Sequence, residues 1–66
     1  MNSLSDVGAA IQTSRKESGL TQEQLADLAG ISERTLRSIE SGNGNPSFAA
    51  VLATLNVLGI RLLVVP

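Results

Sequence analysis

The sequence contains no cysteine and no histidine. The absence of cysteine excludes disulfides, and the absence of both residues excludes the usual zinc sites. Nothing resembles a signal peptide, and no apolar run approaches the roughly 20 residues that a membrane-spanning helix needs, so a cytoplasmic protein is expected. A glycine-rich phosphate loop and a close carboxylate cluster are also missing. We therefore predict no catalytic centre, no metal site and no cofactor, and not an enzyme.

The sequence also lacks an excess of charge of either sign. Five Lys and Arg stand against six Asp and Glu, a formal net charge of −1, which at first sight counts against a nucleic-acid binder. The distribution of the cations favours one, because Arg34 and Arg37 fall within a single predicted helix and Lys16 lies late in the first. With so few cations, one unit is expected to bind DNA weakly and with a shallow salt dependence.

The length of 66 residues is that of one small domain. Such a chain buries only about 60 % of the surface that its unfolded form exposes. Its stability is therefore marginal without a disulfide, a metal ion or a partner subunit. With disulfides and zinc excluded, the remaining source of added stability is a second copy of the chain, which would also double the contacts with DNA. We expect residues 1–66 to form one domain, helical over 1–59 and with a dimerisation segment over 60–66.

Apolar residues at helical spacing predict a first helix over about 5–18, with Ser3 or Ser5 as its N-cap and Gly19 at its end. A turn-rich loop at 42–45 precedes another helix, which Ser47 caps and Gly59 ends. The apolar stripe predicted for this last helix consists of Phe48, Val51, Leu52, Leu55 and Leu58.

Between them, residues 22–41 have the spacing of two short helices joined by a tight turn. Thr21 caps the first of these helices, with Gln24 at the third helical position as in a capping box. Gly30 ends it in the left-handed conformation, and Ser32 caps the next. This is the spacing of a helix-turn-helix motif; the alternative is a helical hairpin in an unrelated bundle. The positions predicted to face inward are Leu25, Ala26, Ala29, Ile31, Leu36 and Ile39.

Several short motifs resemble the Xre/Cro-type family of bacterial and phage DNA-binding domains. They are Thr21-Gln22, Gly30, the run Ile39-Glu40-Ser41-Gly42 and the run Asn45-Pro46-Ser47. The resemblance covers about Gly8 to Gly59. It implies a mostly α, four-helix domain of lambda-repressor type that binds double-stranded DNA at a palindromic operator in the bacterial cytoplasm, at the nucleoid.

In such a fold the helix over 33–41 lies in the major groove. With Leu36 and Ile39 inward, Arg34 and Arg37 can each offer a bidentate fork to guanine, and the sequence does not decide which of them does. Glu33 can accept from cytosine, but Glu33 and Arg37 also have the i, i+4 spacing of an ordinary surface ion pair. The outward positions of this helix are Ser32, Glu33, Arg34, Arg37 and Ser38.

Four further residues have two interpretations each. Gln22 matches the family's glutamine, which contacts a phosphate or braces the groove-reading residues. Asn43 and Asn45 in the loop either reach phosphates or form the turn. Lys16 contacts a phosphate or is a solvated surface charge.

Arg15 and Glu40 have a structural role in the resemblance. An acid in the last turn of a helix opposes the helix dipole, so Glu40 needs a compensating cation. The family pattern pairs it with an Arg at the position of Arg15, which would pin the first helix to the reading helix.

The last residues, 60–65, are apolar at five of six positions and β-branched at three, which favours a strand. A lone strand cannot satisfy its own backbone, so we predict that it pairs with the same strand of a second subunit. The alternative is a frayed tail lying over the last helix. The residues predicted to form the homodimer interface are Ile60, Leu62, Leu63 and Val64.

The terminal run LGIRLLVV (58–65) is similar, within the family, to HipB-like antitoxins. That resemblance implies a transcriptional repressor that autoregulates its operon and holds a HipA-like kinase toxin. The alternative is a stand-alone or phage-type Xre/Cro regulator with no toxin partner.

Overall fold

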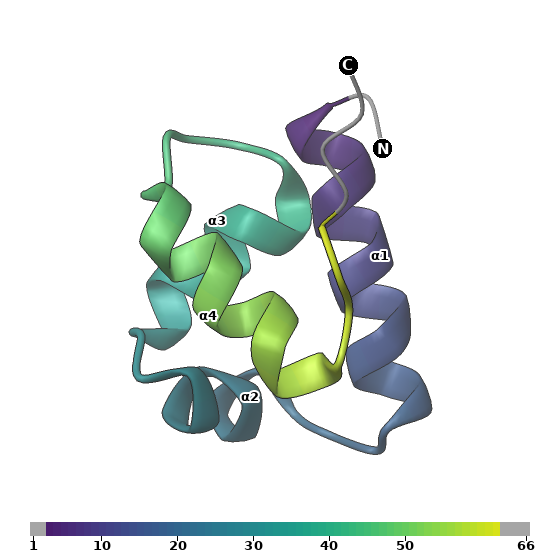
Figure 1. Ribbon diagram of the computed structural model, residues 1–66. Coiled ribbons are helices and arrows are strands. Elements are labelled where there is room, and N and C mark those ends of the chain that lie inside the picture. Colours follow the sequence, from purple (N-terminus) through teal and green to yellow (C-terminus); the bar gives the residue numbers. More distant parts are fainter. Residues whose placement is uncertain (1–2, 63–66) are drawn as a thin grey trace.

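Four helices follow one another in a computed structural model that describes residues 3–62. They are α1 (Leu4–Glu17), α2 (Gln22–Ala29), α3 (Glu33–Ser41) and α4 (Phe48–Leu58). α1 packs against α3, and α2 packs against α4 (Figure 1). The four helices predicted from the sequence are all present, so the mostly α, helix-turn-helix fold is confirmed. No helix within residues 3–62 is long and apolar enough to cross a membrane.

Each helix begins at a serine or threonine that caps it. Ser3, Thr21, Ser32 and Ser47 have extended backbones, and each side-chain oxygen accepts from the backbone N–H three residues further on. The Gln24 side chain also accepts from the Thr21 N–H at 2.9 Å, which completes the predicted capping box. Each cap contributes about 1 kcal/mol. The choice between Ser3 and Ser5 is thereby settled in favour of Ser3.

Each helix also ends on the same glycine motif. The glycine has a left-handed φ of about +72°, and its N–H and the next N–H donate back to carbonyls of the last turn. After α1, α2 and α4 the next residue is Leu20, Ile31 and Ile60, and all three pack against the core. After α3 it is Asn43, which is exposed. The loop after α3 thus lacks the apolar contact that closes the other three ends.

The core contains residues from all four helices. Most of the positions predicted to face inward are in it, but Phe48 is not: its exposed fraction is 65 %. The prediction that Phe48 belongs to the buried stripe of α4 is wrong, because the residue is the first of the helix and its side chain faces solvent instead of the core. The buried apolar residues are Ile11, Leu25, Ala26, Leu36, Ile39, Val51 and Leu55.

The crossing of α1 and α3 depends on Gly8, which sequence reasoning did not identify. Gly8 is buried inside α1, and a Cβ placed there would overlap the carbonyl oxygen of Ile39 and approach that of Glu40. The backbones of the two helices therefore touch at this point. Any side chain at position 8 would separate α1 from the end of α3.

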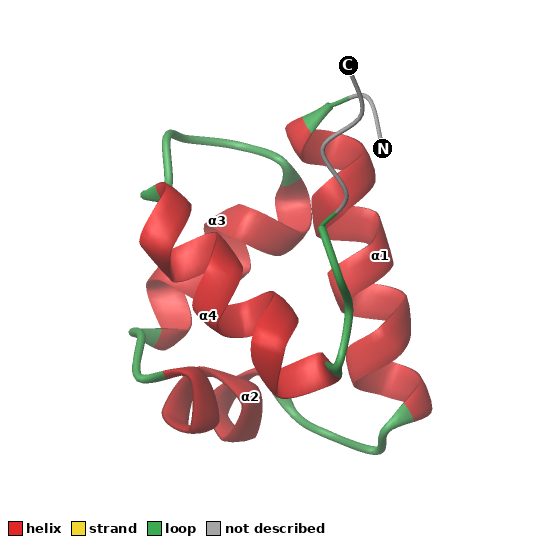
Figure 2. Ribbon diagram, viewed as in Figure 1, coloured by secondary structure: helices red, strands yellow, loops and turns green. Residues whose placement is uncertain are grey.

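The strand predicted over 60–65 is absent from the part of the chain that the structure describes. Ile60, Arg61 and Leu62 belong to no helix and no strand, and Figure 2 shows helices and loops only. The single chain therefore does not show the predicted strand at 60–62. The physical reason is that a strand exists through ladder hydrogen bonds, and residues 3–62 contain no second strand to supply them. Leu63 and Val64 lie outside the described residues.

Candidate nucleic-acid interface

An open hollow lies along α3 and the loop that follows it. Its walls are Arg34, Arg37, Ser38, Ser41 and Asn43, and we call it the α3 hollow. Four of these five residues are among those predicted to contact DNA, and Ser41 was not predicted. The hollow has two cations and no acid in its walls. The other predicted residues lie outside it; they are Lys16, Gln22, Ser32, Glu33 and Asn45.

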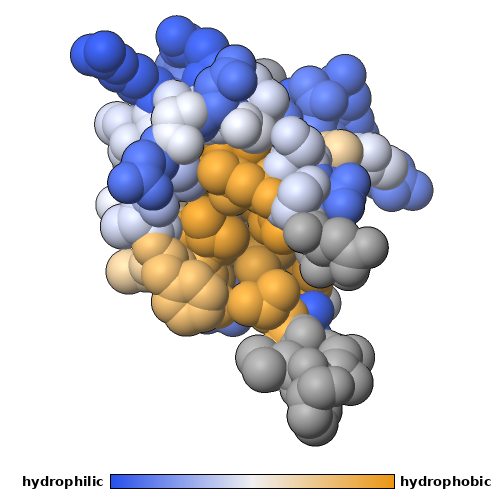
Figure 3. Space-filling model, turned by 90° about the horizontal axis from the view of Figure 1, so that it is seen from above, coloured by the Kyte–Doolittle hydropathy of each residue, from blue (hydrophilic) through white to orange (hydrophobic). Residues whose placement is uncertain are grey.

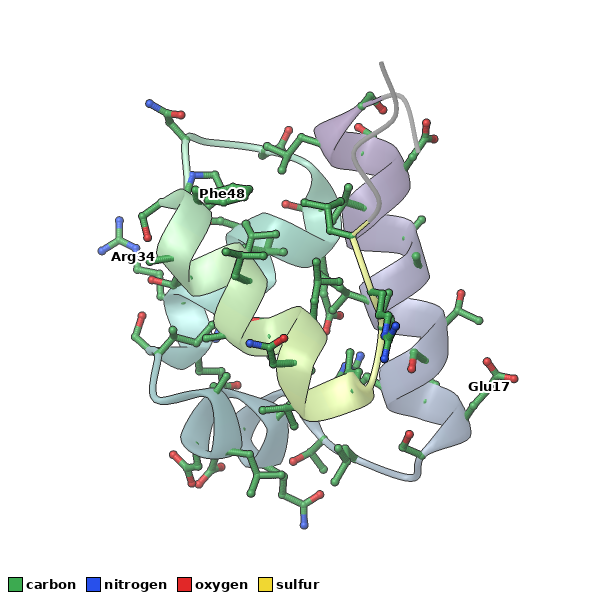
Figure 4. All side chains as sticks on the ribbon, viewed as in Figure 1. Glu17, Arg34 and Phe48 are labelled. Carbon is green, nitrogen blue, oxygen red and sulfur yellow. The ribbon has the colours of Figure 1, made fainter. Side chains whose placement is uncertain are left out.

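The buried face of α3 fixes the direction of its cations. Leu36 and Ile39 are completely buried, so positions on the opposite side of this helix must face solvent. Arg34 is exposed and points away from the molecule (Figure 4). Glu17, at the end of α1, lies on the other side of the molecule in the same view. The Arg34 cation is therefore free to meet an anionic partner at the outward face of α3.

Arg34 and Arg37 differ in their surroundings. The Arg37 Nη2 lies 3.4 Å from the Glu33 Oε1, with 61 % and 44 % of the two side chains exposed. This is the i, i+4 ion pair that the sequence left open as an alternative. An exposed pair contributes at most about 1 kcal/mol, so it exchanges readily for a phosphate or a base. Arg34 has no ion-pair partner within residues 3–62.

Two serines at the interface have capping roles. The Ser32 hydroxyl accepts from the Thr35 N–H at 3.0 Å and donates to the Thr35 Oγ1 at 2.8 Å. Its only proton is therefore engaged, and the hydroxyl has only acceptor capacity left for DNA. Ser41 donates to the Ser38 carbonyl at 3.0 Å and accepts from the Asn43 N–H at 3.4 Å. These bonds hold the rim of the α3 hollow in shape.

A buried network fastens the far side of α3 to the other helices. The Arg15 Nε lies 2.7 Å from the Glu40 Oε2, and Arg15 Nη2 donates to Glu40 Oε1 at 3.1 Å. The Arg15 Nη1 donates to the Leu20 carbonyl at 2.8 Å. Gln22 donates to Glu40 Oε1 at 3.2 Å, which joins it to the buried pair and not to the side chains predicted to read the groove. The Arg15–Glu40 pair expected from the sequence is thus present, with α2 joined to it.

Lys16 lies apart from these groups. It is exposed in the last turn of α1 and has no ion-pair partner among the described residues. Within residues 3–62 there is also no cluster of acidic side chains that could hold a metal ion. The cations and hydrogen-bonding side chains of this arrangement are gathered on the outward face of α3 and the loop after it.

Comparison with known proteins identifies this arrangement. The family model described as helix-turn-helix matches residues 11–65. The HTH-type transcriptional regulator y4mF of Sinorhizobium fredii is 36 % identical over 57 residues, which cover 86 % of this chain and 75 % of that protein. The immunity repressor protein of Bacillus phage phi105 is 43 % identical over 56 residues, 85 % of this chain but 39 % of its own length.

Solved structures agree with the family match. The restriction-modification controller protein C.AhdI from Aeromonas hydrophila is 31 % identical, with a TM-score of 0.78 over 88 % of each chain. A chain of the HipA-HipB-O2-O3 complex has a TM-score of 0.87 over all of this chain and 93 % of its own, at 23 % identity, which shows the fold alone. The model match over most of the sequence and the y4mF relative together show that the chain belongs to the Xre-type helix-turn-helix family.

Proposed function

We propose that the chain is a transcriptional repressor that binds a palindromic operator as a homodimer, with α3 in the major groove. The α3 hollow carries this proposal, because it gathers two arginines and three small polar side chains on the outward face of the second motif helix and the loop that follows it. Arginine forks read guanine, and serine and asparagine side chains bond to phosphates or bases. The phage immunity repressor among the relatives supports repression as the outcome of binding.

Each residue has a distinct role in this proposal. Arg34 reads a base, because no ion-pair partner within residues 3–62 competes for it. Arg37, released from Glu33, contacts a base or a phosphate, and Ser38 and Asn43 bond to the backbone at the rim. Gln22, Ser32 and Lys16 approach neighbouring phosphates, with Gln22 and Ser32 limited by the hydrogen bonds they already make.

An apolar hollow on another face supports the homodimer. It lies between the start of α1, the loop before α4 and the C-terminal segment, and Figure 3 shows apolar side chains gathered there. Its walls include Phe48 and Leu62, whose exposed fractions are 65 % and 37 %. Leu62 belongs to the predicted dimerisation segment, so this hollow continues that surface. We propose that a second copy covers it and that the segments over 60–65 pair as strands only in the dimer. The apolar walls are Leu4, Val7, Pro46, Phe48, Val51 and Leu62.

The repressor is proposed to act as the antitoxin of a HipBA-like module in the bacterial cytoplasm, where it also binds a HipA-like kinase toxin. The support is the terminal run over 58–65 and the likeness of fold to a chain of the HipA-HipB-O2-O3 complex. The phage immunity repressor supports the stand-alone alternative. Co-purification from the native host separates the two: a stable kinase-sized companion is expected for an antitoxin, and its absence contradicts that role but not DNA binding.

DNA binding itself is tested by selection from a random-sequence duplex library. The proposal expects enrichment of a sequence with two-fold symmetry, because a dimer presents two α3 helices to two half-sites. Enrichment of an asymmetric sequence would contradict the dimer, and no enrichment at low salt would contradict sequence-specific binding. Serial selection at rising salt separates specific binding from attraction to phosphates alone.

A further inference from the structure

The loop after α3 places the dipeptide Asn43-Gly44 at the rim of the α3 hollow. Asn43 is exposed and is one of the residues that line the hollow with Arg34 and Arg37. Gly44 follows with a φ of +77°. The carboxamide of an asparagine is separated by only a few bonds from the backbone nitrogen of the next residue. The two groups can therefore react with one another within the chain.

That chemistry is deamidation through a cyclic imide. The Gly44 nitrogen attacks the Asn43 Cγ, and the new C–N bond closes a five-membered ring. The bond from Cγ to the amide nitrogen breaks, and ammonia leaves with the proton that the Gly44 nitrogen gives up. Water then opens the ring at either carbonyl and leaves aspartate or isoaspartate. The net change exchanges an amide and water for a carboxylate and ammonium, with no oxidant or cofactor required.

The surroundings of Asn43 leave this path open. Within the described residues neither the Asn43 carboxamide nor the Gly44 N–H has a hydrogen-bond partner to hold it. A Cβ on Gly44 would lie 3.9 Å from its nearest non-neighbouring atoms, both in the Ser38 side chain, so no other element of the fold presses on this residue. Because glycine has no side chain, nothing on Gly44 itself obstructs its nitrogen, and its backbone has the freedom that ring closure needs.

Two other asparagines in the described residues lack these conditions. Asn45 precedes Pro46, whose nitrogen carries no hydrogen and cannot form the same imide. Asn56 lies inside α4, where the helix fixes the backbone, and the branched Val57 follows it. Both are internal controls within the same chain.

We propose that Asn43 is a deamidation site and that its conversion releases the protein from DNA. The inference rests on the proposed binding of DNA at the α3 hollow. A carboxylate at position 43 adds a negative charge beside Arg34 and Arg37, where it pairs with them and repels phosphates. The isoaspartate product also lengthens the backbone at the residue whose N–H donates to the Ser38 carbonyl at 3.2 Å and closes the end of α3. Each copy of the protein thus has a limited lifetime as a DNA-binding protein.

The experiment ages the purified wild-type chain at neutral pH. Peptide mapping by mass spectrometry follows the change from amide to acid at each asparagine, and each time point is titrated with a duplex that the fresh protein selected from a random library. Asn43 is expected to convert while Asn45 and Asn56 stay amides. The affinity of the sample is expected to fall in step with the converted fraction.

Three variants isolate the cause. Asn43→Asp is expected to bind the duplex about tenfold more weakly than fresh wild type, the effect of one unfavourable charge near a phosphate. Asn43→Ser removes the amide without adding charge and is expected to bind more tightly than Asn43→Asp. Asn43→Gln cannot close the five-membered ring, so whatever its starting affinity, that affinity is expected to stay constant on ageing.

An Asn43 that remains an amide overturns the inference. So does an Asn43→Asp protein that binds as tightly as fresh wild type, even though DNA binding itself then stands. If fresh wild-type protein binds no duplex, the proposed function fails and this inference fails with it; that result is known before ageing begins.

Discussion

At the scale of single residues, Glu40 joins three helices. Its side chain is 2 % exposed, and it receives Arg15 from α1 and Gln22 from α2. A carboxylate in the last turn of α3 opposes the helix dipole, and a buried one without a cation costs far more than an exposed one. The Arg15–Glu40 pair therefore fixes the buried face of α3, and the opposite face of the same helix carries the α3 hollow.

Removing either partner of this pair is expected to destabilise the fold. Arg15→Ala and Glu40→Ala should each lower the free energy of unfolding by about 3–5 kcal/mol, because each leaves a buried charge unpaired. The double variant should lose much less than the sum of the two. Thermal and urea unfolding of the four proteins of this double-mutant cycle measure both effects.

Glu17→Ala is the matched control for this cycle. It removes the same charge from an exposed position at the end of α1 and should change stability little. Strict additivity of Arg15→Ala and Glu40→Ala would mean that the two side chains do not stabilise one another.

Sequence reasoning worked for residues whose roles are local or belong to a known pattern. Ser32, Thr21 and Gly30 cap helices through bonds to residues three to five positions away, so the sequence alone predicts them. The Arg15–Glu40 pair spans 25 positions and was reached only through family resemblance. Asn43 was predicted either to reach a phosphate or to form the turn. Its contrast with the partly buried apolar residue that follows each of the other three helix-ending glycines shows only in the fold.

At the scale of elements, the close approach of α1 and α3 sets the position of the reading helix. Gly8 makes this approach possible, because the carbonyl of Ile39 occupies the space that a Cβ would need. The sequence predicts that α1 is a helix from spacing and caps within it. It does not predict which residue of α1 meets α3, since that contact joins positions 31 apart and shows in no local pattern.

Gly8→Ala is expected to destabilise the protein although alanine is the better helix former. The intrinsic gain is about 1 kcal/mol at most. The overlap with a backbone oxygen cannot be relieved by a side-chain rotation and is expected to cost more, for a net loss of about 1–3 kcal/mol. Thermal unfolding measures the change.

Ala9→Ser, one position along and exposed, is the control and should leave the melting temperature nearly unchanged. A Gly8→Ala protein more stable than wild type would show that α1 and α3 do not approach one another as described.

At the scale of the whole molecule, the sequence predicted one part of the apolar hollow and missed another. The apolar character of 60–65 was evident, but the exposure of Phe48 was not, because its spacing matches that of Val51 and Leu55, which are buried. An exposed aromatic beside Leu62 enlarges the surface available to a partner. A strand that forms only between two chains leaves no trace in one chain by itself.

If two copies cover the apolar hollow, the melting temperature should rise with protein concentration. Phe48→Ser is expected to weaken this dependence and to shift the protein toward the monomer in sedimentation, while keeping its helical circular dichroism. Leu28→Ser is the matched control: Leu28 is 63 % exposed and lies on α2, outside the apolar hollow. A Phe48→Ser protein that remains as dimeric as Leu28→Ser would place the interface elsewhere.

The most direct test of the central claim, that the outward face of α3 reads DNA, is a library selection carried out in parallel with wild type, Arg34→Lys and Glu17→Ala. Arg34→Lys keeps the charge but loses the bidentate fork, so it should lose preference at one position in each half-site, at a cost of about 1–3 kcal/mol for the wild-type sequence. Glu17→Ala removes an exposed charge at the end of α1, on the other side of the molecule from Arg34, and should recover the wild-type site. An Arg34→Lys protein that selects the same site with the same preferences as wild type would contradict the claim.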